Sequence, residues 1–415
     1  MHVKKHKKCR ICGNTNLTEV LDLGLQHIQG AFEHPETLKP PYRKVQNKIV
    51  RCNTDKYEEG CGLIQSEFSV SPEILYRNYW YQSGISQTMT KHLHNIAKEA
   101  INILNASNSL DVLDIAANDG TLLRGYPDFF NRVGIDPSNI ALKQKDVKII
   151  NEVYPNKQLK NQKFDVITSI ACFYDVNEPQ EFVNQVKNNL KESGIWIAEF
   201  AYWPLMLENL AFDQVLLEHS CHYYLFPFEQ LLKQSGLKLF RAEKTNTNGG
   251  SIMIYACNED CDLYENQEWK NNLSTLRFEE FEKELDENKT YESFRNQVKK
   301  YLLNLKNLLL EYKSNNKIVH LYAASTKMNV VLEAVEIDSD LIPYAAERSS
   351  EKWGAKTLSG IKIISEEDSR KMKPDAYICS LIGFKKEIIE REKEYLNAGG
   401  EIIFLPTFEV IKKFY

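Results

Sequence analysis

The sequence predicts an α/β protein of three parts, and three observations carry this prediction. Four of the nine cysteines lie within the first 61 of 415 residues. Apolar segments alternate with stretches of helical periodicity from about residue 108 to 258, and again from 317 to 415. Such alternation is typical of a largely parallel sheet with helices on both faces. We therefore expect a small cysteine-rich domain at 1–68, a central α/β domain at 69–264, connecting helices at 265–310 and a smaller α/β domain at 311–415.

The composition narrows the class of protein. Hydrophobic residues make up 43% of the chain and charged residues 26%, which is ordinary for a globular protein. No apolar run reaches the roughly 20 residues of a membrane span, and no apolar signal segment follows MHVKKHKKC, so we expect a cytoplasmic protein without a membrane partner. The net charge of −5 argues against broad nucleic-acid binding, and the lysines near the N-terminus are read as a solvated tail.

The early cysteines have the pattern of a structural zinc site. Cys9 and Cys12 form a Cys-x2-Cys knuckle followed by a glycine, and Cys52 and Cys61 form a second pair, also followed by a glycine. Four thiolates suit tetrahedral zinc and leave no open position for a substrate. The alternative, four reduced cysteines in a small core, leaves this short segment with little to hold it together. The other five cysteines are read as small buried residues, with Cys257 and Cys261 as a remote candidate for a partial metal pair.

The segment from 69 to about 105 predicts a helix preceded by a polar aromatic run. Met89, Leu93, Ile96, Ala97 and Ile101 recur at helical spacing. Ahead of them lies a run whose hydroxyl groups suit a polar ligand: Tyr79, Tyr81, Ser83, Ser86 and Thr88. The nearby His92 and His94 are read as surface residues.

The stretch 112–123, VLDIAANDGTLL, predicts a buried strand, a tight turn and the start of a helix. Gly120 suits the turn, and Asp114 and Asp119 place two carboxylates at the strand end, where ligands bind in open α/β sheets. Asp136 ends the next strand, at the spacing at which an acidic residue holds ribose hydroxyls. Because the Gly-x-Gly-x-x-Gly pattern is absent, a nucleoside without phosphate at the turn, S-adenosylmethionine, fits better than a dinucleotide. The alternative is an ordinary strand-to-helix turn whose acidic residues bind no ligand.

A second polar cluster follows the strand at 194–200. It includes Asp213, Glu218, His219, His222 and Tyr224 in a segment rich in aromatic residues. A histidine is the side chain best matched to proton abstraction near neutral pH, and a neighbouring carboxylate orients it. Two alternatives are a metal site at Glu218, His219 and His222 and a polar loop with satisfied histidines. Gly249 and Gly250, just before a later strand, allow a ligand to approach the backbone closely.

The rest of the chain predicts a connecting helix and the C-terminal α/β domain. Residues 298–309 carry one apolar stripe, which predicts a helix packed on both neighbouring domains. The first turn of the C-terminal domain, AASTK at 323–327, lacks the glycines of a dinucleotide site, so no cofactor is expected there.

Together these features resemble the three-domain, zinc-containing, S-adenosylmethionine-dependent sugar C-methyltransferases, which act next to the ketone of nucleotide-linked 4-keto-deoxysugars. The resemblance covers nearly the whole chain and preserves domain order, implying a Rossmann-like class I methyltransferase domain in the centre and a Rossmann-like C-terminal domain. Residues that match family motifs are Cys9, Cys12, Cys52 and Cys61; Tyr79, Tyr81, Ser83, Ser86, Thr88 and Met89; Asn118, Asp119 and Gly120; Asn248, Gly249, Gly250 and Ser251; Lys327 and Asn329; and Arg348, Lys352 and Gly354.

The catalytic stretch departs from the family pattern. The family's Tyr-His-Glu-His reads Leu216, Leu217, Glu218, His219 here, so only the second histidine, the implied general base, remains. The family's Asn-x-x-x-His after the fourth strand becomes the segment from Ala171 to Asp175. The family's Trp-Asn near the C-terminus appears only as Gly383-Phe384, and Ala116 replaces a glycine of the cofactor turn. These changes favour a different sugar or an altered reaction.

The resemblance implies a mechanism and a set of site residues. His219, oriented by Glu218, removes a proton beside a ketone, with His222 as the second candidate base. Tyr224, Asn248, Gly249 or Gly250 would stabilise the enolate. The implied cofactor-binding residues are Tyr81, Ser86, Asp114, Asn118, Asp119, Gly120 and Asp136. The implied substrate-binding residues are Tyr79, Ser83, Asn248, Gly249, Gly250, Lys327, Arg348 and Lys352, with the cations reaching the diphosphate.

Three rival functions stay open at this point. One is methyl transfer to oxygen or nitrogen, which would need no carbon acid. Another is a zinc-ribbon protein that binds nucleic acid, which the negative net charge of the chain disfavours. The third is a binding protein with a degenerate pocket. For the oligomeric state, we expect a monomer or a homodimer.

Overall fold

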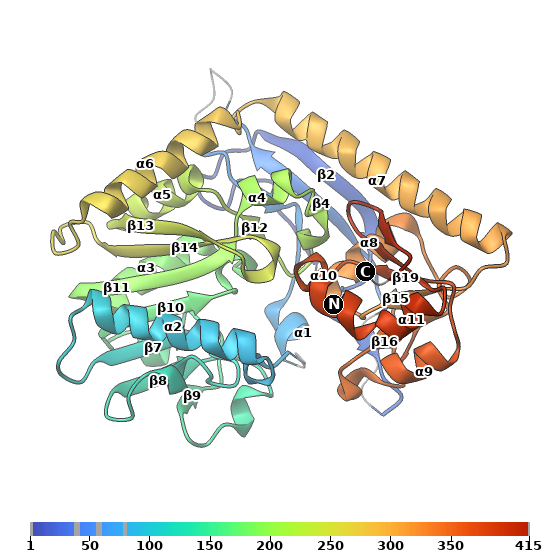
Figure 1. The fold of residues 1–415 in the computed structure, drawn as a ribbon. Coiled ribbons are helices and arrows are strands. Elements are labelled where there is room, and N and C mark those ends of the chain that lie inside the picture. Colours follow the sequence, from blue (N-terminus) through green and yellow to red (C-terminus); the bar gives the residue numbers. More distant parts are fainter. Residues whose placement is uncertain (1–2, 37–41, 55–59, 78–80, 414–415) are drawn as a thin grey trace.

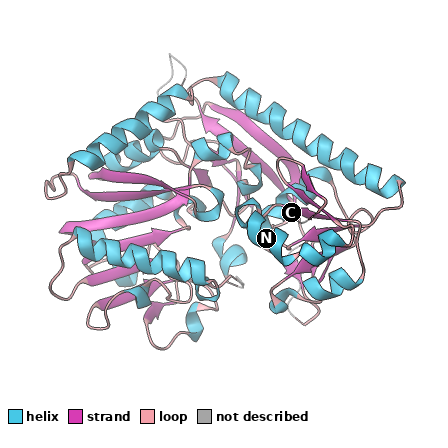
Figure 2. Cartoon of the chain, viewed as in Figure 1, coloured by secondary structure: helices cyan, strands magenta, loops and turns pink. Residues whose placement is uncertain are grey.

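The structure is a computed structural model, and it describes residues 3–36, 42–54, 60–77 and 81–413. It confirms the predicted three-part α/β architecture. A seven-stranded sheet and an eight-stranded sheet lie on opposite sides of the molecule, and a four-stranded sheet joins them (Figure 1). Figure 2 shows the same arrangement by secondary structure, with helices flanking both large sheets.

The central sheet has the strand order β13-β14-β11-β10-β7-β8-β9. Its strands are β7 (Asp111–Ile115), β8 (Asn131–Ile135), β9 (Lys148–Ile150), β10 (Phe164–Ile170), β11 (Leu190–Ala201), β13 (Leu237–Thr245) and β14 (Ser251–Asn258). Five of them, β7 to β11, run parallel, whereas β14 runs antiparallel to both of its neighbours. The sequence predicted every strand except β13, whose half-buried pattern carries fewer apolar residues.

Alternate residues of the central strands pack against helices on opposite faces. Val166 and Ile197 share a core with helix α2 (Gln87–Ile103), which buries Leu93 and Ile96 as its apolar spacing predicted. Ile167 and Trp196 share the other core with α3 (Pro179–Asn189) and α5 (Leu225–Gln234). Successive side chains of a strand point to opposite faces of the sheet, so a strand covered by helices on both faces is apolar along its length and can be recognised in the sequence.

The prediction that a helix follows the turn at 116–121 is wrong. Only a single 3-10 turn, Leu123–Gly125, follows, and the chain then leads through Pro127 to β8. Helix α2 already covers this face: a Cβ added to Gly125 would lie 3.0 Å from the Ala97 Cβ and 3.0 Å from the His94 Cα. The space for a long helix at this turn is therefore filled by a helix that precedes the sheet in the chain.

The N-terminal part is built on a sheet with the order β12-β5-β4-β2. Three of its strands are local, β2 (Leu17–Gln26), β4 (Val45–Cys52) and β5 (Ile64–Ser66), but β12 (Cys221–His222) comes from the central part. A separate antiparallel pair joins β1 (Val3–Lys5) to β6 (Phe68–Val70). The short helix α1 (Pro72–Tyr76) then leads towards the central part.

The C-terminal sheet has the order β21-β20-β19-β15-β16-β18-β17-β3. Its parallel strands are β15 (Val319–Tyr322), β16 (Tyr344–Glu347), β18 (Lys362–Ser365), β19 (Ala376–Cys379) and β20 (Glu401–Phe404). Antiparallel strands at the edges are β17 (Lys356–Thr357), β21 (Glu409–Ile411) and β3 (Phe32–Glu33), the last contributed by the N-terminal part. The helices are α8 (Thr326–Val335), α9 (Glu366–Lys371), α10 (Lys385–Arg391) and α11 (Lys393–Asn397). Because β3 and β12 cross the predicted domain boundaries, the three parts share sheets.

The connecting segment is two helices, α6 (Gln267–Glu282) and α7 (Asn288–Ser314), along the upper edge of Figure 1. The predicted stripe of α7 is buried at Val298, Tyr301, Leu305 and Leu309. The fully buried Arg51 of β4 fastens this segment to the N-terminal part, because its guanidinium donates to the Asp286 carbonyl oxygen at 2.9 Å.

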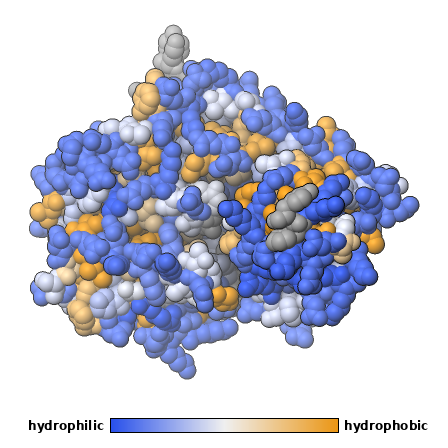
Figure 3. Space-filling model, in the orientation of Figure 1, coloured by the Kyte–Doolittle hydropathy of each residue, from blue (hydrophilic) through white to orange (hydrophobic). Residues whose placement is uncertain are grey.

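The face of the molecule drawn in Figure 3 is mainly polar. Hydrophilic residues cover most of the face in Figure 3, and hydrophobic residues appear there in scattered patches. No helix among the described residues has the length and apolar character needed to cross a bilayer.

Candidate active site

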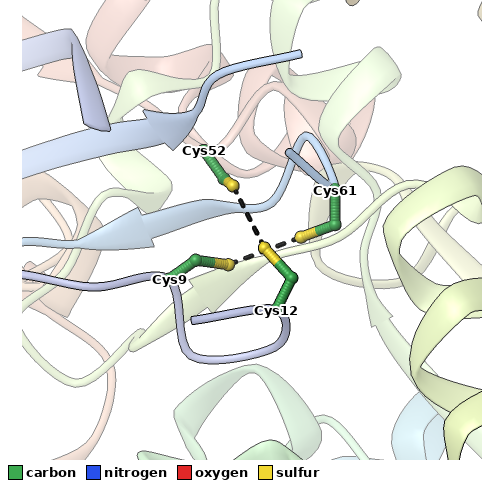
Figure 4. A group of neighbouring side chains, drawn as sticks. All are labelled: Cys9, Cys12, Cys52 and Cys61. Carbon is green, nitrogen blue, oxygen red and sulfur yellow. Dashed lines mark hydrogen bonds between the residues drawn. The ribbon is translucent and has the colours of Figure 1, made fainter. Parts of the chain in front are cut away.

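The four predicted zinc cysteines form one cluster (Figure 4). Their sulfur atoms all lie within 4.8 Å of one another, with Cys9 to Cys61 and Cys12 to Cys52 both at 3.4 Å. Zinc with four sulfurs at about 2.3 Å places the sulfurs about 3.8 Å apart, so the cluster fits a tetrahedral ion. The glycines after each knuckle adopt φ angles of +74°, which other residues rarely adopt. The long insert between Cys52 and Cys61 does not separate their sulfurs.

The principal cavity of the described residues opens between the central and C-terminal parts, and Pro72 and Tyr76 of α1 also line it. It has a volume of about 520 Å³, within the range of small-molecule sites. One end is formed by Ala116, Asn118 and Asp136 at the carboxyl ends of β7 and β8. Another part of the wall is formed by His219 and by Lys327 of the C-terminal part. The predicted cofactor turn and the predicted base therefore face one cavity, as a transfer between two bound molecules requires.

Two predicted acids, Asp114 in β7 and Asp136 after β8, lie near the cofactor turn, and Asp136 lines the cavity. Asp114 is buried and its Oδ1 accepts a hydrogen bond from the Thr168 hydroxyl at 2.6 Å. Burial raises the pKa of Asp114 to about 7. Asp136 accepts from the backbone amides of Asn118 at 2.9 Å and Ser138 at 2.7 Å, so its carboxylate is fixed at the cavity wall.

Asn118 and Asp119 fasten the aromatic run to the turn. The Asn118 side chain accepts from the Ser83 amide at 3.1 Å and donates to the Tyr81 carbonyl at 2.9 Å. Asp119 Oδ2 accepts from the Gly84 amide at 2.8 Å. Asp119 and Gly120 lie behind the cavity wall, whereas Tyr81, Ser83 and Asn118 line it. The turn thus positions a loop over the cavity.

Ser86 has a different position from its predicted neighbours. Its hydroxyl caps the start of α2 by accepting from the Met89 amide at 3.3 Å, and it does not line the cavity. Tyr79 lies outside the described residues, and the side chain of Asn248 is likewise not described. Gly249 and Gly250 have positive φ angles, and a Cβ added to Gly249 would lie 4.0 Å from Lys327 Nζ.

His219 is the predicted base that the structure places in the cavity wall. The residue is buried, and its Nε2 lies 4.0 Å from Oδ1 of Asp175. The ring also packs on Tyr174, with centroids 4.2 Å apart. Burial, with a contribution from His222, lowers the pKa of His219 well below its ordinary value. The imidazole is therefore neutral at physiological pH and able to accept a proton.

Glu218 does not orient His219, which corrects the sequence-based expectation. Its Oε1 accepts from the Gly30 amide at 2.8 Å, and its Oε2 is buried without a hydrogen-bond partner among the described residues. A Cβ added to Gly30 would lie 2.8 Å from that Oε1, so a side chain there would push the Glu218 carboxylate aside. Next to it, the Leu217 amide donates to the Gln29 side chain at 3.0 Å. The N-terminal part therefore positions the segment that carries His219.

His222 and Tyr224 lie outside the cavity wall, contrary to their predicted roles. His222 is buried in β12 against Trp203, with ring centroids 5.7 Å apart, and burial lowers its pKa to about 3. Tyr224 directs its hydroxyl at the zinc knuckle, where a Cβ on Gly62 would meet it at 2.1 Å. Both residues pack the junction between the central and N-terminal parts.

Only one of the three predicted substrate cations faces the cavity. Lys327, in the first turn of α8, lines it, and burial lowers the lysine's pKa while Asp213 opposes that shift. Lys352 instead donates to the Ala324 carbonyl at 2.7 Å and lies 3.5 Å from Glu347. Arg348 is exposed and lies 3.6 Å from Glu387. A buried lysine that supports a turn is not distinguishable by sequence from one that binds phosphate.

Family models match all three parts of the chain. A zinc binding domain matches residues 9–76, a methyltransferase domain matches 81–242, and a C-methyltransferase C-terminal domain matches 246–406. The C-methyltransferase NovU of Streptomyces niveus is 24% identical over 412 residues, covering 97% of this chain and 96% of that protein.

The chain is an S-adenosylmethionine-dependent methyltransferase. It has the three parts of a C-methyltransferase: a zinc-binding part, a Rossmann-like methyltransferase domain and a C-terminal α/β domain.

Solved structures are similar to part of the methyltransferase. An S-adenosylmethionine-dependent methyltransferase from Clostridium acetobutylicum has a TM-score of 0.33 and 16% identity, covering 40% of this chain and 91% of that one. The magnesium protoporphyrin IX methyltransferase of Synechocystis, with bound S-adenosylhomocysteine, has a TM-score of 0.32 and 14% identity, covering 40% and 84%.

Several residues of the methyltransferase cavity escaped the sequence-based assignment. Asp175, Tyr76, Tyr174 and Gln214 line the cavity, and Gly30 contacts Glu218 from the N-terminal part. Asp175 had a signal, because it follows β10, the strand whose end faces the same crevice. Gly30 had none, since its contact joins residues 188 positions apart.

Proposed function

We propose that this methyltransferase methylates the carbon next to the ketone of a nucleotide-linked keto-deoxysugar, with His219 as the general base. The observation that carries the proposal is that His219, a buried and neutral imidazole, lines the same cavity as the cofactor turn. A C–H bond beside a ketone needs such a base, since its proton is only weakly acidic.

The cofactor end of the cavity fits a nucleoside with a sulfonium group. Asp136 presents a fixed carboxylate, which suits two ribose hydroxyls, and the neighbouring wall is apolar at Ile135, Pro137 and Val153. When bound, S-adenosylmethionine supplies an electrophilic methyl group. Asn118 and Asp119 hold the loop at 81–84 beside this end through hydrogen bonds to the Ser83 and Gly84 amides.

The substrate end fits a sugar joined to a diphosphate. Lys327 provides the positive charge at the cavity, and the backbone at Gly249 approaches it closely. His219 removes the proton from the carbon next to the ketone, and the resulting enolate carbon is then the nucleophile. The enzyme's contribution is to hold that carbon in line with the methyl group, which is worth roughly 7–11 kcal/mol in well-oriented systems.

Isotope exchange tests this proposal. We expect the enzyme, incubated in D₂O with S-adenosylhomocysteine and a nucleotide-linked 4-keto-deoxysugar, to exchange the proton on the carbon beside the ketone, as measured by NMR. Methyl transfer to oxygen or nitrogen requires no ionised carbon acid and predicts no exchange. Methylation of the sugar without enzyme-catalysed exchange at that carbon would therefore contradict C-methylation through His219.

A further inference from the structure

Asp175 is a carboxyl group in the cavity wall that the proposed mechanism leaves without a role. It ends the 3-10 turn Phe173–Asp175, which follows β10 by two residues, and its side chain is partly buried, with 18% of its surface exposed. Its Oδ1 has no hydrogen-bond partner among the described residues. A buried polar atom without a partner is costly, so its retention in a ligand cavity indicates a partner supplied by the ligand.

The position of Asp175 relative to the base defines what it can reach. Its Oδ1 lies 4.0 Å from His219 Nε2, and both residues line the same cavity. At 4.0 Å the two groups are too far apart for a hydrogen bond to each other. A ketone presents its acceptor oxygen on one carbon and an acidic proton on the next carbon, so an acid and a base that line one cavity close together can engage both.

We propose that Asp175, as a carboxylic acid, donates a hydrogen bond to the substrate ketone oxygen while His219 takes the proton from the adjacent carbon. This inference rests on the proposed function and adds a second catalytic residue to it. The C–H bond breaks and an N–H bond forms on His219. The C–H electron pair becomes the carbon–carbon double bond, and the carbonyl π pair moves to the oxygen that Asp175 faces.

The surroundings of Asp175 favour the neutral acid that this role needs. Burial, together with the nearby Glu218, raises its pKa well above the ordinary value, while a hydrogen bond with Tyr76 opposes the shift. The titratable groups that face it are Glu218 and His219 of the segment at 216–220, Tyr76 of α1, Cys221 of β12 and Cys172 beside β10. An acid held neutral by an apolar site can donate to an enolate oxygen, as one carboxyl of ketosteroid isomerase does.

The test compares two substitutions that differ in hydrogen-bond donation. Asp175→Asn keeps an N–H donor of similar size, whereas Asp175→Leu has none. For the exchange reaction with S-adenosylhomocysteine bound, we expect Asp175→Leu to lower the rate at least about 100-fold and Asp175→Asn to lower it less than about tenfold. Because the acid must be protonated, the wild-type rate falls as pH rises through its raised pKa, and Asp175→Asn removes that fall.

Each outcome bears on the proposal. Equal losses in the two variants would show that the negative charge of Asp175 matters and would overturn the inference, as would no loss in either. An alkaline fall that persists in Asp175→Asn would also overturn it. The affinity for S-adenosylhomocysteine, measured by calorimetry, confirms that each variant is folded. If a variant does not fold, the pH dependence of the wild-type exchange rate is the test. A wild-type rate that does not fall at alkaline pH contradicts the inference. A wild-type enzyme without exchange refutes the proposed function itself, whereas normal wild-type exchange with equal variant losses refutes only the role of Asp175.

Discussion

Replacing His219 with alanine is expected to lower kcat by about 10²–10⁴-fold, the usual contribution of a general base. His219 is the only histidine among the described residues whose side chain lines the cavity. The affinity for S-adenosylhomocysteine, measured by calorimetry, should change little, because His219 is not one of the residues predicted to hold the cofactor. Because burial lowers the pKa of His219, the wild-type enzyme should stay active below the pH at which a free imidazole becomes protonated.

A matched control separates loss of the base from general damage. His34→Ala also removes an imidazole, but His34 does not line the cavity, so this variant should retain the wild-type rate. Full exchange and methyl transfer by His219→Ala would show that another group removes the proton. His222 would not be the first alternative, because it is buried in β12, the edge strand of the N-terminal sheet, and does not line the cavity.

Cys52→Ser is expected to remove the bound zinc and to abolish methyl transfer. Structural zinc sites contribute roughly 10–16 kcal/mol to the folding of small domains, so loss of one buried thiolate should lower the Tm by about 10 °C or more. The effect reaches the cavity because Gly30 and Gln29 of the N-terminal part bond to Glu218 and Leu217. Metal analysis, thermal unfolding and the methylation assay measure the three effects.

Cys261→Ser is the control for this substitution, because Cys261 lies outside the zinc cluster. It should retain one zinc per chain and the wild-type activity. A zinc-free Cys52→Ser enzyme with full activity would contradict the conclusion that the zinc-binding part positions the segment carrying His219.

Local patterns predicted the fold because each was confined to a few neighbouring residues. Short apolar segments between stretches of helical periodicity located β7 to β11, and the two knuckles located the zinc site although the Cys52–Cys61 insert is unusually long. The features of the fold that were not predicted depend on packing between residues far apart in the sequence. Helix α2 displaced the helix expected after the cofactor turn, and strands β3 and β12 crossed into neighbouring parts.

The sequence predicted several residues that line the candidate site. It did not predict the contacts that other segments of the chain make with the charged residues near it. His219, Asn118, Asp136 and Lys327 line the cavity as expected. The assignments of Glu218 and Lys352 failed for a common reason: each charged group is held by backbone of another segment, Gly30 in one case and Ala324 in the other. Residue type and spacing do not reveal which partner a buried charge will find.

The position of the transferred methyl group tests the central claim most directly. With S-adenosylmethionine labelled with carbon-13 at the methyl group and a nucleotide-linked keto-deoxysugar, NMR of the product reports the atom that carries the label. We predict a methyl group bonded to the carbon beside the ketone, seen as carbon–carbon coupling in a uniformly labelled sugar. A label bonded to oxygen or nitrogen would contradict the account.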